Sequence, residues 1–299
     1  MSDESAVFSY YPGCMATETA REYDASIRTL AGLCDVILDE IDDWNCCGAD
    51  VVKEAHPEAA VVLAQRNLEL AAQVVVSGCP VCVRRLQEAS RAERAMHVLG
   101  VFARADVREK LRAKIEATGE ERPLGSMKVA CFYGRALSDA VLWGGGDGPW
   151  PMDVLMGLAG ATVVKWSGGR RPSGGYALLA TPEEGFETLA KVFRDFEKSD
   201  ADAIVTADPH AHFNLDSFQY TVGRRRRRAL DVPVFHFTEL LALAMGLERA
   251  DKWLSRHITG TFTLIDRLVA EEDERKRAEG RRHKPEARST KHETSTKFK

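Results

Sequence analysis

Apolar residues along the first two thirds of the chain fall into two recurring patterns. Short apolar runs predict buried strands at residues 6–11, 74–76, 128–133, 161–165 and 203–206. Apolar residues at helical spacing predict helices at 17–38, 57–72, 84–95, 154–160, 182–198 and 213–220. Alternating strands and helices are typical of an α/β fold with largely parallel sheets, which is the fold class we predict.

The pattern of elements begins again after residue 127. The segments VVVSGCPVCVRRL (74–86) and AIVTADPHAHFNL (203–215) align without a gap, and such self-similarity indicates an internal duplication. A glycine, a proline and several charges cluster between the two copies. We therefore predict two pseudo-symmetric repeats, at residues 6–120 and 127–245.

The end of the chain differs from both repeats in composition. Residues 246–279 predict a helical extension, with a helix from Gly246 to about Ala270. Residues 280–299 are polar, basic and nearly free of large apolar side chains, which predicts a disordered tail.

Length and charge narrow the possible classes of protein. The chain has 299 residues, enough for two domains, and its 41 basic and 45 acidic side chains give a net charge of −4, which argues against general nucleic-acid binding. No apolar run approaches 18 residues, and the N-terminus is polar and acidic, so we expect neither a membrane span nor a secretory signal. A cytoplasmic protein follows as the prediction.

Seven cysteines in a cytoplasmic chain indicate ligands or redox groups rather than disulfides. Five of them form three groups: Cys14, the pair Cys46 and Cys47, and the pair Cys79 and Cys82. Thirty-one residues separate Cys14 from Cys46, and thirty-one separate Cys47 from Cys79. Each group follows a predicted strand or lies in a turn, and such turns meet at the carboxyl edge of a parallel sheet. Because clustered thiolates repel one another, this convergence favours a soft metal or an iron–sulfur centre.

Other arrangements explain fewer of these cysteines. A structural zinc site commonly uses two Cys-x-x-Cys hooks, and only one is present. A thioredoxin-like dithiol would use Cys79 and Cys82 alone. Adjacent cysteines such as Cys46 and Cys47 cannot easily face one metal ion but can reach two neighbouring irons. The remaining Cys34 lies on the apolar face of a predicted helix, as a small buried hydrophobe does.

Three motifs, YYPGC (10–14), WNCCG (44–48) and GCPVC (78–82), resemble the cysteine-rich CCG domain of the B-type subunit of heterodisulfide reductase. The resemblance implies that Cys14, Cys46, Cys47, Cys79 and Cys82 ligate a noncubane [4Fe-4S] cluster that cleaves or forms disulfides. It also implies two partners, the iron–sulfur protein that serves as the C-type subunit of that enzyme and the flavoprotein that serves as its A-type subunit.

The second repeat departs from this family pattern. We expect Cys131 at the position of Cys14, residues 172–175 at the position of the adjacent pair, and Asp208 and Ala211 in place of Cys79 and Cys82. This predicts a degenerate CCG domain that has kept its pocket and lost its cluster.

Two histidines add candidate chemistry to that pocket. His210 and His212 are candidate catalytic residues, because imidazole can move a proton near neutral pH. An alternative is a zinc or iron site made of Asp208, His210, His212 and Cys131.

The predicted function is that of the B-type iron–sulfur subunit in a heterodisulfide-reductase-like complex, in sulfur oxidation or another non-methanogenic metabolism. Its expected chemistry is electron transfer coupled to thiol/disulfide or sulfane-sulfur redox, with a lipoyl carrier protein as a possible partner. Two alternatives stay open: a non-catalytic electron-relay or assembly subunit, and a zinc-stabilised binding module.

Overall fold

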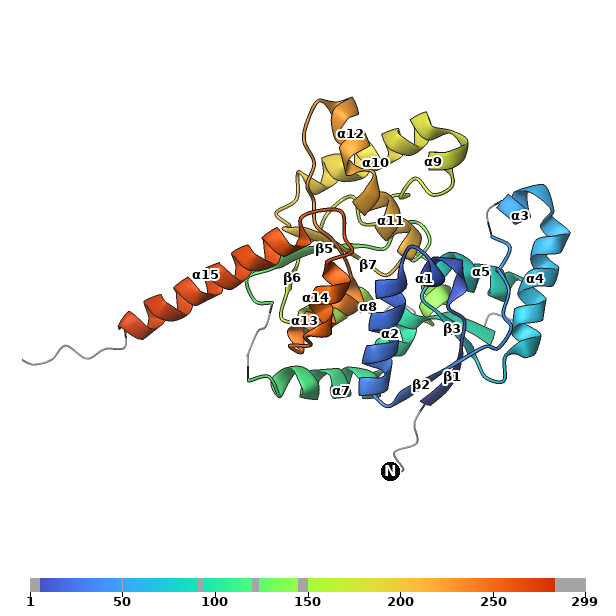
Figure 1. Cartoon of the computed structure of the whole chain (residues 1–299), viewed down its shortest axis with the longest axis horizontal. Helices are drawn as coiled ribbons and strands as arrows, with labels where there is room; N and C mark the ends of the chain where they lie inside the picture. The colour runs from blue at the N-terminus through green and yellow to red at the C-terminus, as the bar shows by residue number, and fades with distance from the viewer. Residues whose placement is uncertain (1–5, 50, 91–93, 120–123, 145–149, 283–299) are drawn as a thin grey trace, which may run out of the picture.

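Figure 1 shows the computed structural model of the chain, which describes residues 6–49, 51–90, 94–119, 124–144 and 150–282. It contains two four-stranded sheets in which every pairing between neighbouring strands is parallel. The strands of the first sheet are, in spatial order, β2 (Val36–Glu40), β1 (Ala6–Tyr10), β3 (Val75–Ser77) and β4 (Ala95–His97). Those of the second are β6 (Thr162–Val163), β5 (Lys128–Phe132), β7 (Ala203–Thr206) and β8 (Val234–His236). Since the two sheets have the same strand order, the predicted α/β class and the pseudo-symmetric duplication are confirmed.

Helices connect the strands of each sheet. Those of the first half are α1 (Gly13–Thr17), α2 (Arg21–Leu33), α3 (Val51–Ala55), α4 (Pro57–Leu70), α5 (Pro80–Glu88), α6 (Val98–Phe102) and α7 (Ala105–Glu116). Those of the second half are the 3₁₀ turn η2 (Ala140–Trp143), α8 (Pro151–Leu158), α9 (Ala177–Ala180), α10 (Pro182–Phe196), α11 (Pro209–Ser217), α12 (Gln219–Arg226) and α13 (Phe237–Ala244). Proline occupies the first position of α4, α5, α8, α10 and α11, where its missing N–H costs no hydrogen bond.

Two predicted helices in the first repeat are too long. The helix predicted at 17–38 ends at Leu33, and residues from Val36 onward form β2 beside β1. Asp35 has a φ of 56°, a left-handed conformation that ends the helix. The helix predicted at 84–95 begins earlier, at Pro80, and ends at Glu88, while Ala95 opens β4. Strands of three to five residues are too short to show a clear period of two.

The C-terminal extension also differs from its prediction. Two helices replace the single one expected after Gly246, namely α14 (Arg249–Leu254) and α15 (Thr261–Arg282). The second of them projects from the body of the protein and continues past residue 280 (Figure 1). Most of the predicted tail, residues 283–299, lies outside the described residues.

The two repeats share one apolar core, with α2 of the first packed on α13 of the second. Polar groups also cross this interface. The Tyr23 hydroxyl donates a hydrogen bond to the Ala207 carbonyl at 3.0 Å, and the Ser26 and Thr238 hydroxyls lie 2.6 Å apart. The Tyr23 ring stacks on His236 with 4.0 Å between ring centroids. The end of β7 is thereby held against the first repeat.

Candidate metal centre

The structure brings the five N-terminal cysteines together at the carboxyl edge of the first sheet. They come from the start of α1, from the loop after β2 and from the start of α5. The Sγ atoms of Cys47 and Cys82 lie 3.3 Å apart. Cys46 is hydrogen-bonded to both Cys14 and Cys47, and Cys79 is hydrogen-bonded to Cys82. The five thiols therefore form one continuous chain of contacts.

Two glycines make this convergence possible. Gly13 has a φ of 72°, and a Cβ atom added there would lie 3.2 Å from the Cys82 Sγ. Gly48 has a φ of 73°, and its added Cβ would lie 2.9 Å from the Cα of Ala60 in α4. Since L side chains are strained at such φ values, the glycines of the YYPGC and WNCCG motifs are needed for the backbone path as well as for the close approach.

The loop that carries Cys46 and Cys47 is anchored through Asn45. The Asn67 side chain accepts a hydrogen bond from the Asn45 N–H and donates one to its carbonyl, both at 2.9 Å. The Tyr11 hydroxyl donates to the same carbonyl at 2.8 Å, and Arg66 donates to the Asn45 side chain at 2.9 Å. The adjacent cysteines therefore sit in a preorganised turn.

Crowding of the thiols separates their pKa values. Hydrogen bonds from Cys14 and Cys47 lower the pKa of Cys46 to about 2, whereas the hydrogen bond with Cys46 raises the pKa of Cys47 to about 12. Hydrogen bonding with Cys47 and Cys79 raises the pKa of Cys82 well above its ordinary value. Five such thiols cannot all ionise unless a cation compensates their charge. This donor set fits a soft metal or an iron–sulfur cluster.

The segment that carries these cysteines matches a known protein family. Residues 8–87 match the CCG family, described as a cysteine-rich domain. Over this range the first repeat is similar to the CCG domain. The matched segment contains all three cysteine groups, and its limits include β2, β3 and most of β1.

Relatives of the whole chain extend this result. The 8-methylmenaquinol:fumarate reductase membrane anchor subunit of Wolinella succinogenes is 26% identical over 279 residues, which cover 84% of this chain and 96% of that protein. The B-type subunit of the ferredoxin:CoB-CoM heterodisulfide reductase of Methanosarcina mazei is 24% identical, with coverage of 80% and 89%. The resemblance to the B-type subunit of heterodisulfide reductase, drawn above from three motifs, is confirmed.

Solved structures show a likeness of fold. A hypothetical protein from Helicobacter pylori superposes with a TM-score of 0.61 at 10% identity. The superposition covers 87% of this chain and 53% of that protein, so the chain spans about half of its length. Within the described residues, each helix is too short or too polar to cross a bilayer.

A side chain of the second repeat reaches the five cysteines, which we call the CCG site. His210, in the first turn of α11, is hydrogen-bonded to Cys79. The N–H of His210 in turn donates to the Asp208 carboxylate at 2.9 Å, and burial raises the pKa of Asp208 to about 6. His212, the other candidate histidine, is buried elsewhere: its Nε2 lies 3.2 Å from the Val234 carbonyl and its ring stacks on His236. Only His210 of the two reaches the cysteines.

The metal set considered for the second repeat does not assemble around Asp208. Among the described residues, the group with suitable spacing is His212, Glu239 and His257, whose ligand atoms lie within 4.8 Å of one another. The His257 Nδ1 lies 2.8 Å from the Val234 carbonyl, and its Nε2 lies 3.0 Å from the Glu239 carboxylate. Because both partners only accept hydrogen bonds, His257 is an imidazolium. Burial opposes that charge, but Glu239 outweighs it and raises the pKa of His257 to about 9. The group is thus a buried ion pair.

The prediction that Cys131 occupies the position of Cys14 is wrong. Cys131 lies inside β5 and pairs with Val205, whereas Tyr10 of β1 pairs with Val76. Since 76 and 205 are equivalent in the gapless alignment, Cys131 takes the place of Tyr10 and not that of Cys14. A single thiol near the end of β5 does not indicate the register of that strand. The register depends on pairing with β7, which is distant in the sequence.

The second repeat keeps the turns of the CCG site without its thiols. An added Cβ at Gly174 would lie 3.3 Å from the carbonyl of Gly185 in α10, much as the one at Gly48 meets Ala60 in α4. Residues 172–173 therefore stand where the adjacent cysteines stand in the first repeat. The five counterparts of the cysteines are Arg135, Pro172, Ser173, Asp208 and Ala211.

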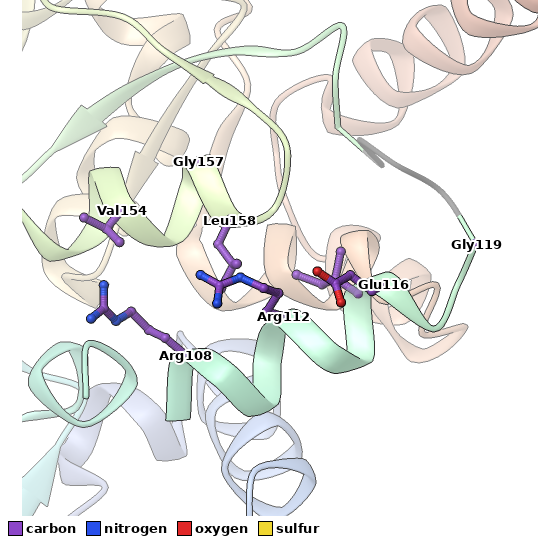
Figure 2. Close-up of a pocket in the computed structure, with 8 residues that line it drawn as sticks. Arg108, Arg112, Glu116, Gly119, Val154, Gly157 and Leu158 are labelled. Carbon is purple, nitrogen blue, oxygen red and sulfur yellow. The ribbon is translucent and has the colours of Figure 1, made fainter. Parts of the chain in front are cut away.

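A large cavity lies apart from the cysteines, between α7 and α8. Its volume is about 610 Å³, and Figure 2 shows Arg108 and Arg112 of α7 directed toward Val154 and Leu158 of α8. None of its lining residues is a cysteine. The CCG site instead reaches the surface through Cys14 and Cys46, which are exposed, while the other three thiols are buried.

Proposed function

We propose that the chain is the iron–sulfur subunit of an oxidoreductase complex and that its five N-terminal cysteines hold one cluster. The observation that carries this proposal is the continuous chain of thiol contacts at the edge of the first sheet, formed from three loops that are distant in sequence. When bound, such a cluster takes up and releases electrons.

The pattern of contacts favours a noncubane [4Fe-4S] cluster. Cys46 hydrogen-bonds to Cys14, whereas Cys47 lies 3.3 Å from Cys82. Adjacent cysteines that face different neighbours suit ligation of two irons better than ligation of one.

Thiol/disulfide or sulfane-sulfur chemistry is the reaction class that we favour. Two relatives are named as the B-type subunits of CoB-CoM heterodisulfide reductases. Cys14 and Cys46 are exposed, so a disulfide could approach the cluster. His210 lies beside Cys79. There it would hold a proton for the substrate sulfur that is reduced to a thiol. His212 has no such access, because it is buried against Val234 and His236.

A second candidate is an electron relay without sulfur chemistry of its own. It is favoured by the relative from a fumarate reductase, which matches 84% of this chain, and by the restriction of the thiol cluster to one repeat. In either case the expected partners are an iron–sulfur protein like the C-type subunit and a flavoprotein like the A-type subunit of heterodisulfide reductase. A lipoyl carrier is the sulfur-bearing partner in the first case. The proposed location is the cytoplasm.

Metal analysis and substrate reduction test these proposals. Protein purified without oxygen should contain iron and acid-labile sulfide, whereas stoichiometric zinc without iron would support a binding module instead. The reduced complex should then be mixed with a lipoylated carrier or with CoB–CoM disulfide while thiols and the electron paramagnetic resonance of the cluster are followed. Reoxidation by a disulfide supports sulfur chemistry. Reoxidation by the flavoprotein partner alone supports the relay.

A further inference from the structure

A cavity of about 400 Å³ opens in the second repeat, beside α8, which packs on β5 and β6. It lies where β5 ends and where the chain leaves β6. Its walls include the thiol of Cys131, the rings of Tyr133, Trp150 and Trp166, and the charged side chains of Asp153, Lys165 and Arg170.

The equivalent place in the first repeat is filled. There the Tyr10 hydroxyl donates to Asp24 at 2.7 Å, and the Arg28 guanidinium lies 4.5 Å from the centre of the Tyr10 ring. Arg28 also pairs with Asp24 and with Glu40. Arg28 thus pairs with both carboxylates, and the Tyr10 ring is fully buried.

Replacement of Tyr10 by Cys131 removes the ring that fills this space. Asp153 of α8 is the counterpart of Asp24, because it hydrogen-bonds to Cys131 as Asp24 does to Tyr10. A second tyrosine, Tyr133, also donates to Asp153, at 2.9 Å. The carboxylate is thus already engaged by its own repeat.

The charge beside the strand is inverted as well. Val129 pairs with Val163, and extending that register places Lys165 opposite Cys131, as Glu40 lies opposite Tyr10. Arg170 lies over the Trp150 ring, 4.2 Å from its centre. In the part of the chain that the structure describes, neither Lys165 nor Arg170 forms an ion pair with a carboxylate. The cavity therefore presents two exposed cations and one carboxylate, that of Asp153, which is hydrogen-bonded to Cys131 and Tyr133.

We propose that this cavity binds a small organic anion with a flat aromatic body, such as an aromatic carboxylate. Aromatic walls suit a planar ring, and the guanidinium and ammonium groups suit its negative charge. The volume lies within the range of small-molecule pockets, roughly 300–1,000 Å³. The site belongs to the second repeat and does not depend on the cluster proposed for the first.

Calorimetric titration of the anaerobically purified protein tests this site with two probes of matched shape. 2-Naphthoate carries the anion, and 2-naphthalenemethanol is its neutral counterpart. We expect naphthoate to bind at least about tenfold more tightly, and Lys165→Gln or Arg170→Gln to weaken its binding about tenfold or more, since hydrogen bonds to charged groups are the strong ones. Lys191→Gln, which removes an exposed charge on α10, is the matched control and should leave the affinity unchanged.

Cys131→Tyr rebuilds the side chain of the first repeat and should abolish naphthoate binding. If that variant does not fold, the Lys165 and Arg170 variants, which alter exposed side chains, still decide the question. Failure of naphthoate to bind at millimolar concentration, equal affinity for both probes, or unchanged affinity in both charge variants would overturn the proposal. Binding that persists in Cys46→Ser would show that the site stands even if the cluster proposal fails.

Discussion

The two repeats have the same sheet topology but different side chains at the carboxyl edge of the sheet. Each has four parallel strands in the same order, with proline-initiated helices after the third strand. The first gathers five thiols at the carboxyl edge, and the second has none at the equivalent positions. The second sheet nevertheless has a fully buried core. Apolar packing therefore maintains this fold without the cysteines, and the side chains at the carboxyl edge of the sheet can differ between the repeats.

One position carries a proposed ligand in the first repeat and a helix cap in the second. Cys79 precedes α5 and makes no side-chain cap hydrogen bond, whereas its counterpart Asp208 accepts one from the N–H of His210. Aspartate is a preferred N-cap residue, and it stabilises a helix that cysteine leaves uncapped. The residue that replaces this proposed metal donor thus contributes to the stability of α11.

The largest effect expected from this comparison is on iron content. Cys46→Ser should lower iron from about four atoms per chain, the content of one [4Fe-4S] cluster, to nearly none, because a hydroxyl is a poor ligand for the cluster. Visible absorbance and iron analysis after anaerobic purification measure this. Cys34→Ser and Cys131→Ser are the controls and should retain full iron. About eight irons per chain, or iron loss in Cys131→Ser, would mean that the second repeat also holds a cluster.

Gly48→Ala should destabilise the first repeat by about 3 kcal/mol. About 1–2 kcal/mol comes from an L residue at positive φ and the rest from overpacking against the Ala60 backbone, 2.9 Å away. Gly119 has a similar φ of 77° with open space around its added Cβ, so Gly119→Ala should cost only the backbone strain, about 1 kcal/mol. Urea unfolding of both variants measures the difference. Equal losses would show that close approach to α4 does not matter.

Two buried histidines, His97 and His257, should respond to pH in opposite directions. The pKa of His257 is raised to about 9 by Glu239, against the effect of burial. Its contribution to the free energy of unfolding, about 3 kcal/mol, is therefore complete below pH 6.5 and is lost as the pH rises through 9. Burial lowers the pKa of His97 to about 4, so its contribution is present above pH 6.5 and is lost as the pH falls toward 4.

Unfolding free energies measured across this range should decline on both sides. The decline above pH 7 should be shallower in His257→Gln than in the parent, and that in His97→Gln should match the parent. An unchanged alkaline decline in His257→Gln would contradict the ion pair with Glu239.

The smallest effect concerns the contact that His210 of the second repeat makes with the CCG site. His210→Leu removes a hydrogen bond to Cys79 and should lower the reduction potential of the cluster by up to about 60 mV, since a net hydrogen bond is worth about 0.5–1.5 kcal/mol. His210→Gln retains a donor and should recover part of the loss. Redox titration followed by electron paramagnetic resonance measures both. A potential that is the same in all three proteins would restrict His210 to a packing role.

Local pattern in the sequence determines a large part of this protein. The α/β class, the duplication and the three cysteine groups all follow from short-range features, because helical periodicity, apolar strands and turn residues are encoded within a few neighbours. The two glycines beside Cys14 and Cys47 belong to the same local signal, and the structure explains them through positive φ values.

Register and contacts between repeats were decided only by the tertiary structure. Cys131 takes the place of Tyr10 because β5 pairs with β7 in one register out of several that its apolar run would allow. His210 reaches Cys79, and His212 does not, because α11 presents the two side chains to different neighbours. The pairing of His257 with Glu239 joins α13 to the segment after α14. These arrangements depend on how distant segments pack, and no window of neighbouring residues contains that information.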